Sequence, residues 1–312
     1  MSSQELRNRL RNALREIKFS QELQNLIDHT TGSIFYVDSV GGQAANTGQA
    51  SDEAVTTLTL AIALCTAGKG DIIYLMPKHN ENIGNAQIDI DKDGITIIGL
   101  GHGAQRPRFD FDNANSSINI KAKDVVMRNI TFLPSVTDVL IAIDIETLQT
   151  GTLLDGLEAL VGEDGAGVDD FASFIELKVG CDQTIIRNCR VRQHASGAGY
   201  ISCVLLNGAS DDIVIEDCDF KILGAGAEAP IYGTTTLSTN VVIARCVLTS
   251  DAEPGIKFVS STTGTIEFVH IFSDVTNIDD SIEATGMANF ENYWVELGDE
   301  AGTLIKTPSI DG

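Results

Sequence analysis

A short pattern of apolar and polar residues recurs along the chain at nearly regular intervals. Its clearest copies cover residues 125–132, 184–191, 213–220 and 241–248, and weaker copies begin at residues 95 and 264. The first, third, sixth and eighth positions of a copy are mostly apolar, which predicts a short strand, a bend and a second strand. Repetition of one such unit indicates a solenoid.

The spacing of the copies distinguishes between kinds of solenoid. Successive copies begin 23 to 30 residues apart, except for one interval of 59 residues that corresponds to two coils, one of them enlarged. A leucine-rich repeat would show a regular leucine and asparagine consensus, and a propeller blade would need about four strands in 40 or more residues. Neither pattern is present. We therefore predict a mainly β chain folded as a single-stranded right-handed parallel β-helix, whose coils stack about 4.8 Å apart around one core.

Three of the six cysteines stand at the sixth position of successive copies. Because a free cysteine behaves as a small apolar side chain, we predict that Cys189, Cys218 and Cys246 form a buried column. The chain has no CxxC motif and no Cys/His pair at ligand spacing, so no zinc site and no cofactor are predicted. Scattered cysteines of this kind suit a reducing compartment.

The first thirty residues differ from the rest of the chain. An apolar stripe flanked by basic residues predicts an amphipathic helix there, formed by Leu6, Arg7, Leu10, Arg11, Leu14, Arg15 and Ile17. Two interpretations are open. The helix either caps the open end of the solenoid or acts as an arm that docks on an acidic partner.

The segments that follow suggest three regions. A strand over 33–38, a helix over 52–66 and a strand from residue 71 lead into the repeats. We assign residues 1–30 to a docking or capping arm, 31–297 to the β-helix and 298–312 to a C-terminal tail.

The chain is strongly acidic. It has 21 Lys+Arg against 44 Asp+Glu, a net charge of −23. Such a surface repels phosphate backbones and anionic lipids, so nucleic acid and membranes are not predicted as partners. No run of 18 apolar residues and no apolar signal segment is present, so we expect neither a spanning helix nor a signal peptide.

Several segments resemble a known superfamily. Residues 35–39 and 70–77, with the helix between them, resemble the first coil of pectin-lyase-like β-helix proteins. Residues 95–101 and 106–109 are similar to the next coil of tailed-phage virion proteins within that superfamily, and the closing segment from residue 289 resembles how those proteins end. The resemblance covers about residues 33–312 and implies a β-helical virion component.

Two segments interrupt the repeat. Leucines and an acidic, glycine-rich run enlarge the chain between residues 146 and 172. We predict a lateral insertion there, which either projects to make contacts or folds back on the shaft. Asp89, Asp91 and Asp93 match the first half of a calcium loop, but Leu100 stands where the bidentate acid belongs. A plain turn ending at Gly94 is the preferred interpretation, and calcium is a weak alternative.

The superfamily includes enzymes that cut acidic polysaccharides, so catalytic residues must be considered. Lyases need calcium and a base, and hydrolases need two carboxyl groups about 5–9.5 Å apart. The chain offers acidic pairs at 169–170, 211–212 and 279–280, and His102, His194 and Lys257 as bases, but not in the family's order. The low aromatic content disfavours a sugar-stacking groove. No catalytic residue is predicted.

Acidic and amide residues also precede many of the repeated strands. We expect them to cap turns through their own backbone. They are Asp93, Asp124, Asp182, Asp211, Asp212 and Asn240.

Together these features predict a non-enzymatic phage virion structural protein, assembled into the particle in the host cytoplasm. The most favoured form is a capsid-exterior decoration, cement or head-attached protein. Its arm would bind the major capsid protein or other virion proteins, and we expect a homo-oligomer, with a trimer as one arrangement. The alternatives are a tailspike-type polysaccharide depolymerase, acting as lyase or glycoside hydrolase, and a receptor-binding fibre shaft.

Overall fold

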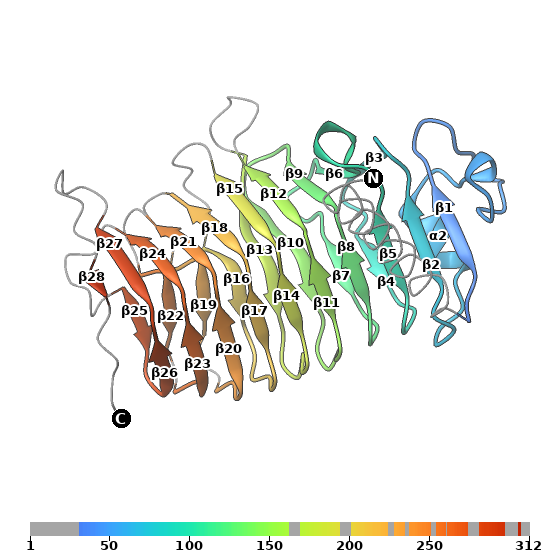
Figure 1. Cartoon of the computed structure of the whole chain (residues 1–312). Coiled ribbons are helices and arrows are strands. Elements are labelled where there is room, and N and C mark those ends of the chain that lie inside the picture. The colour runs from blue at the N-terminus through green and yellow to red at the C-terminus, as the bar shows by residue number, and fades with distance from the viewer. Residues whose placement is uncertain are drawn as a thin grey trace, which may run out of the picture.

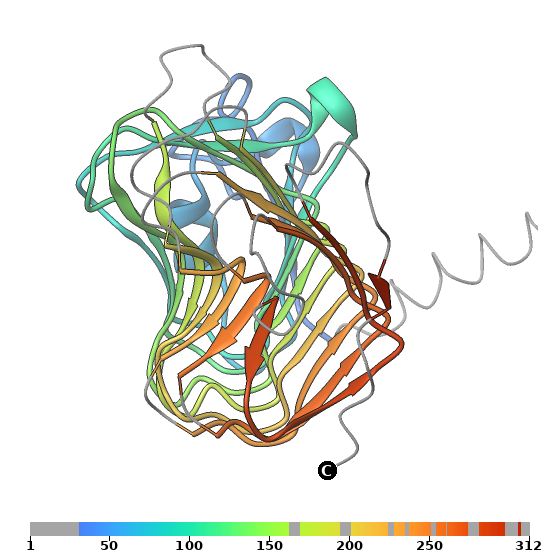
Figure 2. The same ribbon diagram turned by 90° about the vertical axis from the view of Figure 1, so that its left-hand side faces the viewer.

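The computed structural model shows a β-solenoid in which each coil contributes strands to three sheets around a common interior (Figures 1 and 2). The structure describes residues 31–161, 169–193, 201–223, 228–234, 237–250, 254–259, 261–273, 281–296 and 305–306. The predicted arm, residues 1–30, and most of the predicted tail lie outside these residues.

Sheet A contains ten strands. In spatial order they are β1 (Ile34–Val37), β2 (Ile72–Leu75), β5 (Thr96–Gly99), β8 (Val126–Arg128), β11 (Leu153–Asp155), β14 (Ile185–Arg187), β17 (Val214–Glu216), β20 (Val241–Ala244), β23 (Gly264–Glu267) and β26 (Met287–Phe290). All neighbours in this sheet are parallel.

Sheet B follows sheet A along the chain in every coil after the first. Its strands are β3 (Asn80–Ile83), β6 (Arg108–Phe111), β9 (Thr131–Pro134), β12 (Glu158–Val161), β15 (Arg190–Gln193), β18 (Asp219–Ile222), β21 (Val247–Ser250), β24 (His270–Ser273), β27 (Tyr293–Glu296) and β28 (Ile305–Lys306). Only β28 is antiparallel to its neighbour among the described strands.

Sheet C returns the chain to sheet A. Its strands are β4 (Ile88–Ile90), β7 (Ile118–Ile120), β10 (Val139–Ile145), β13 (Phe171–Leu177), β16 (Ser202–Leu206), β19 (Ile231–Gly233), β22 (Ile256–Phe258) and β25 (Ile282–Ala284). The described residues also form the short helices η1 (Ser51–Glu53), α2 (Leu58–Leu64) and η2 (Gly103–Gln105). None of the helices in the described part of the chain is long and apolar enough to cross a membrane.

The repeated pattern corresponds to the corner between sheets A and B. In the copy over 125–132, the predicted inward residues Val125, Met127, Ile130 and Phe132 are fully buried. The bend is made by Asn129, whose φ of 57° lies in the left-handed region. Residues at this position of other coils share that conformation, because the chain must change direction between two strands without a longer loop. The sequence pattern thus predicted both strands and the bend.

The long interval between two copies contains a regular coil. Strand β11 pairs with β8 and β14 in sheet A, and β12 pairs with β9 and β15 in sheet B. Leu154 and Leu157 point into the core and are fully buried. The prediction of a lateral insertion near 146–172 is therefore wrong for residues 153–161, because these leucines are core positions of a coil whose polar positions differ from the repeat. Residues 162–168 lie outside the described part.

Helix α2 covers the N-terminal end of the core. Leu58, Ala61 and Ile62 are buried, and the helix contacts β1, β2 and β4. It is shorter than the helix predicted over 52–66, because Val55 instead pairs with β1 through the bonds Val55 N to Tyr36 O (3.0 Å) and Asp38 N to Val55 O (2.8 Å). Helix α2, which lies within the described residues, therefore caps the N-terminal end of the solenoid core.

The predicted cysteine column is confirmed. Cys189, Cys218 and Cys246 are free thiols and at most 2% exposed. Each thiol donates to backbone carbonyls of its own or the preceding coil. Burial raises the pKa of Cys218 well above its usual range, and contacts with the two neighbouring thiols raise it further.

We expect the three thiols of this column to be inert in the native protein. At pH 8 a thiol reagent should label them far more slowly than it does in urea, because the folded chain covers all three thiols. Cys189→Ala should lower the free energy of unfolding by about 1–3 kcal/mol through lost burial and a small cavity. Rapid labelling of all three in the folded protein would show that the register of the coils is wrong.

Candidate functional site

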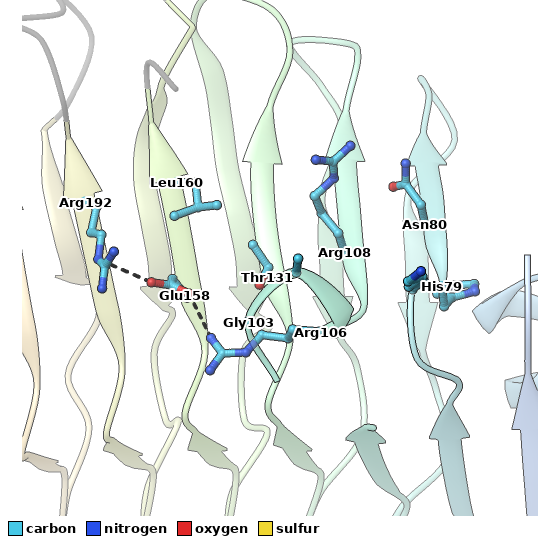
Figure 3. Close-up of a pocket in the computed structure, with 11 residues that line it drawn as sticks. His79, Asn80, Gly103, Arg106, Arg108, Thr131, Glu158, Leu160 and Arg192 are labelled. Atoms are coloured by element: carbon cyan, nitrogen blue, oxygen red, sulfur yellow. Dashed lines mark hydrogen bonds and ion pairs between the residues drawn. The ribbon is translucent and has the colours of Figure 1, made fainter. Parts of the chain in front are cut away.

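The outer face of sheet B is hollowed across its first strands. One cavity of about 660 Å³ extends from β3 to β15 beneath the η2 loop. A second, of about 450 Å³, continues toward β18, and the two share Gly103, Arg106, Glu158 and Arg192. Figure 3 shows the first cavity with its lining side chains. We call this surface the arginine groove and define it by Arg106, Arg108, Glu158, Arg190 and Arg192.

Strand register brings these side chains to one face. Alternate residues of a strand point outward, and the outward positions of neighbouring strands are in register. Arg108 of β6 pairs with Thr131 of β9, which pairs with Glu158 of β12, and Glu158 pairs with Arg190 of β15. Arg192 lies two residues further along β15. A row of charged side chains therefore crosses the strands along the solenoid axis.

Glu158 lies at the centre of the groove and is held from both sides. Arg106 donates from Nη1 to Glu158 Oε2 at 2.9 Å, and Arg192 Nε lies 3.3 Å from Glu158 Oε1. Both contacts are drawn in Figure 3. The Glu158 side chain is only 18% exposed. These two ion pairs orient both guanidinium groups within the groove.

The other two arginines of the groove are also positioned by carboxylates. Arg190 Nε lies 3.2 Å from Asp219 Oδ2, and Arg108 Nε lies 2.6 Å from Asp110 Oδ1. A guanidinium group has five N–H donors, and one carboxylate uses at most two of them. The Arg108, Arg190 and Arg192 side chains are 39–49% exposed. They can therefore donate to an anion in the groove while their existing ion pairs remain.

His79 borders the groove, but both of its ring nitrogens contact other groups of the first coil. Its Nδ1 accepts a hydrogen bond from Ser39 N (3.0 Å), and its Nε2 lies 3.2 Å from Glu81 Oε2. Glu81 Oε2 also accepts from Leu58 N at the start of α2. Ser39 Oγ accepts from Asn80 N. This arrangement supports the first coil, and Ser39 has no free histidine nitrogen to activate it as a nucleophile.

A second polar cluster lies on the outer face of sheet C. Lys178 Nζ donates to Asp144 Oδ2 (2.7 Å) and to Glu146 Oε2 (2.9 Å), and Asn207 donates to Glu176 Oε1 (2.7 Å). Asp144 and Glu176 are partners in adjacent strands, and both are at least nine-tenths buried. Burial raises the pKa of Asp144, and the nearby Glu146 and Glu176 add to this, although Lys178 opposes them.

The weak calcium candidates do not converge. Asp89 accepts from Asn119 and from Lys121, Asp91 pairs with Lys92, and Asp93 accepts from the backbone of the next coil. In the part of the chain that the structure describes, no three His, Cys, Asp or Glu side chains are grouped so that they could hold a metal ion.

The acidic and basic residues considered for catalysis are dispersed. Asp170 is buried and accepts from Asp138 N, Asp211 accepts from Thr239 and Asn240, and His102 is exposed beside η2. Lys257 pairs with Glu228 at 2.8 Å. Residues 279–280 and His194 lie outside the described residues.

The Asx residues at the turns from sheet C to sheet A have structural roles, as predicted, but two of them bond to the adjacent coil and not to their own backbone. Asp124, Asp212 and Asn240 have φ of 54–57°. Asp93 Oδ1 and Asp182 Oδ1 accept from backbone N–H groups of the next coil at 2.9 and 2.8 Å. The expectation that these side chains bond to their own backbone is therefore wrong for the two residues Asp93 and Asp182, because the adjacent coil offers closer donors.

The arginine groove was missed by sequence reasoning. Its signal is the alternation of arginine in residues 106–108 and 187–192 of an otherwise acidic chain. Alternation places Arg190 and Arg192 on one outward face, but only the stacking shows that residues 106–108 lie on the same face.

Comparison with known proteins supports the fold and no closer relationship. No known family profile and no curated protein matches the sequence. Among solved structures, a rhamnogalacturonan lyase superposes with a TM-score of 0.59 at 13% identity, over 88% of this chain and 79% of that chain. The pectate lyase Pel9A gives 0.55 at 12% identity, over 85% and 75%.

A phage protein is also similar, but more distantly. ORF18 of Geobacillus virus E2 gives a TM-score of 0.39 at 12% identity, over 77% of this chain and 59% of that chain, which is too low to establish a shared fold. The two lyases confirm the resemblance to pectin-lyase-like proteins at the level of fold. The chain is a parallel β-solenoid similar in architecture to polysaccharide lyases.

Proposed function

We propose that this protein binds a carboxylated polysaccharide along the arginine groove. The observation that carries the proposal is the row of guanidinium groups, each positioned by a carboxylate and each with donors left for a ligand. Guanidinium groups bind carboxylates through two parallel hydrogen bonds. An elongated groove along the solenoid axis suits a polymer better than a small molecule.

The charge of the whole chain favours a sugar acid over nucleic acid. A net charge of −23 opposes a ligand with a phosphate at every unit. A polysaccharide with carboxylates on some of its sugars meets this repulsion less strongly, because its charge is more widely spaced. The named substrates of the two similar lyases, rhamnogalacturonan and pectate, are both carboxylated polysaccharides, which supports the proposal, although pectate carries a carboxylate on every sugar.

The proposal is tested by removing two arginines that hold Glu158. The double variant Arg106→Gln, Arg192→Gln should bind polygalacturonate at least about tenfold more weakly by isothermal titration calorimetry, because two charge-assisted contacts are lost. Binding by the unaltered chain should weaken with salt. Lys121→Gln is the matched control, since it removes an exposed, ion-paired cation next to strand β7 of sheet C, away from the groove. An equal loss in the control, or no binding by the unaltered chain, would contradict the proposal.

We propose further that the protein acts as a virion component of a phage, attached through residues 1–30. Helix α2 already covers the N-terminal end of the core, which favours docking over capping as the role of the arm. In this proposal the arm binds the major capsid protein or another virion protein, and the shaft presents the groove to the surroundings. Self-association, with a trimer as one form, remains part of the proposal.

Cleavage of a polysaccharide on the outer face of sheet C, a different face from the arginine groove, is the second candidate function. The pair Asp144 and Glu176 favours it, because a carboxyl group with a raised pKa beside another carboxylate is typical of acid catalysis. We propose that the protein binds the polysaccharide without cleaving it. Incubation with polygalacturonate should then yield neither unsaturated uronates nor new reducing ends. Release of either product that disappears in Asp144→Asn would establish a depolymerase instead.

A further inference from the structure

The outer face of sheet B changes character beyond β18. Up to that strand its outward residues are mostly charged, whereas the last coils carry Val247, His270 and Tyr293 at the same positions. The His270 and Tyr293 rings lie 5.3 Å apart with an interplanar angle of 77°. At the adjoining corner, Phe268 is 51% exposed and Phe290 is 47% exposed. We call Phe268, His270, Phe290 and Tyr293 the aromatic strip; it lies on β24, β26 and β27 and the corner before β24, toward the left of Figure 1.

Phe268 occupies a backbone position that is unfavourable for it. Its φ is 54°, in the left-handed region where bulky side chains are outliers. The equivalent corners of earlier coils have Asn129, Asn188 and Asp217, residues that tolerate this conformation. The two corners on either side of Phe268 have Arg245 and Glu291, which are exposed and charged, so Phe268 alone among these residues is aromatic. Half of the Phe268 side chain remains in solvent, so core packing does not explain its presence. A strained aromatic residue on the surface points to an external contact.

The aromatic strip continues the arginine groove. Arg190 of β15 pairs with Asp219, Asp219 with Val247, and Val247 with His270. Neighbouring strands are about 4.8 Å apart, so three steps cover about 14 Å along the axis. One step is close to the length of one sugar unit in an extended chain. A polysaccharide in the groove would therefore reach the strip within a few sugar units.

We infer that the aromatic strip binds uncharged pyranose rings of the same polysaccharide whose carboxylates occupy the arginine groove. The apolar C–H face of a pyranose stacks on an aromatic ring, and the strip contains no lysine or arginine to pair with a carboxylate. The ligand class is then an acidic heteropolysaccharide that combines uronates with neutral sugars. This inference rests on the proposed function and narrows its ligand. It also locates the aromatic contacts that the low aromatic content seemed to disfavour.

Phe268→Asn is a suitable probe because it restores the residue type found at equivalent corners. The variant should have an unchanged or higher Tm, since asparagine relieves the left-handed strain. A loss of binding in it cannot then be attributed to unfolding. Leu140→Asn is the matched control, because Leu140 is 54% exposed on sheet C, away from the strip.

The experiment compares two probes on the full chain by isothermal titration calorimetry. Polygalacturonate contains only uronates, and hyaluronan alternates a uronate with an uncharged amino sugar. The unaltered chain should bind hyaluronan more tightly. Phe268→Asn should weaken hyaluronan binding about three- to tenfold, the range expected for one aromatic contact, and change polygalacturonate binding less than about twofold, whereas Leu140→Asn should change neither.

Four outcomes would contradict the inference or the groove proposal. Equal affinity of the unaltered chain for both probes, or no effect of Phe268→Asn on hyaluronan, overturns the inference. If Phe268→Asn instead converts an oligomer into monomers in sedimentation velocity while binding is unchanged, the strip is an interface between copies, and the inference is wrong. If Arg106→Gln, Arg192→Gln affects neither probe, the groove proposal fails independently of the strip.

Discussion

Replacing Phe132 with alanine is expected to lower the free energy of unfolding by about 3–5 kcal/mol. Phe132 is fully buried and lies at the centre of an aromatic cluster. Its ring centroid is 5.4 Å from that of Phe174, 6.2 Å from that of Phe111 and 6.3 Å from that of Phe109. These neighbours belong to two other strands, β6 and β13, and stacked coils cannot move together to fill the space. The variant therefore loses both burial and ring contacts.

Urea unfolding followed by circular dichroism measures this effect. Leu160→Ala is the control, because Leu160 lies on the adjacent strand β12 but faces the groove and is half-buried. We expect its cost to be below about 1.5 kcal/mol. Because coils of a solenoid can unfold separately, the midpoint of the first transition is the quantity to compare. A cost for Phe132→Ala no greater than that of the control would contradict the packing described here.

A chain that begins at Thr31 is expected to fold and to lose attachment to phage particles completely. The solenoid has its own core from β1 onward, and α2 covers its first coil. Solenoid stability is a sum of local and nearest-neighbour contributions, so removal of residues 1–30 leaves the stability of the later coils unchanged. The Tm of the shortened chain should lie within a few degrees of that of the full chain.

Co-sedimentation with particles measures the loss of attachment. The full chain should co-sediment, and its binding should weaken with salt if Arg7, Arg11 and Arg15 pair with acidic groups on the shell. A full-length variant in which these three arginines are replaced by glutamine separates the contribution of charge from that of the apolar stripe. Aggregation of the shortened chain, together with no binding by the full chain, would show that the arm is a cap and not a docking segment.

The strands and corners of the coils were predictable because they depend on local rules. Alternation of apolar residues determines which side chains face the core, as at Val125 and Met127. A single asparagine at the bend, as at Asn129, is explained by its tolerance of positive φ. These signals act over a few residues, so they are readable wherever the repeat is clear.

The coil over 153–161 shows where such rules fail. Gly156 makes its bend, and Leu157 occupies the buried position that cysteine occupies in later coils. The coil therefore lacks the asparagine and the cysteine that identified its neighbours. A column of the core accepts any apolar residue of suitable volume. The pairing with β8 and β14 identifies it as a coil.

The sequence by itself determined the class of fold, the burial of the cysteine column and the distinct character of the first thirty residues, because these follow from periodicity and charge along the chain. Only the tertiary structure decided where the arginines meet. Arg106 and Glu158 are 52 residues apart and form a 2.9 Å hydrogen bond, and Arg192 reaches the same carboxylate from the next coil. Contacts between coils depend on the exact number of residues in every intervening turn, and no local pattern reports that number.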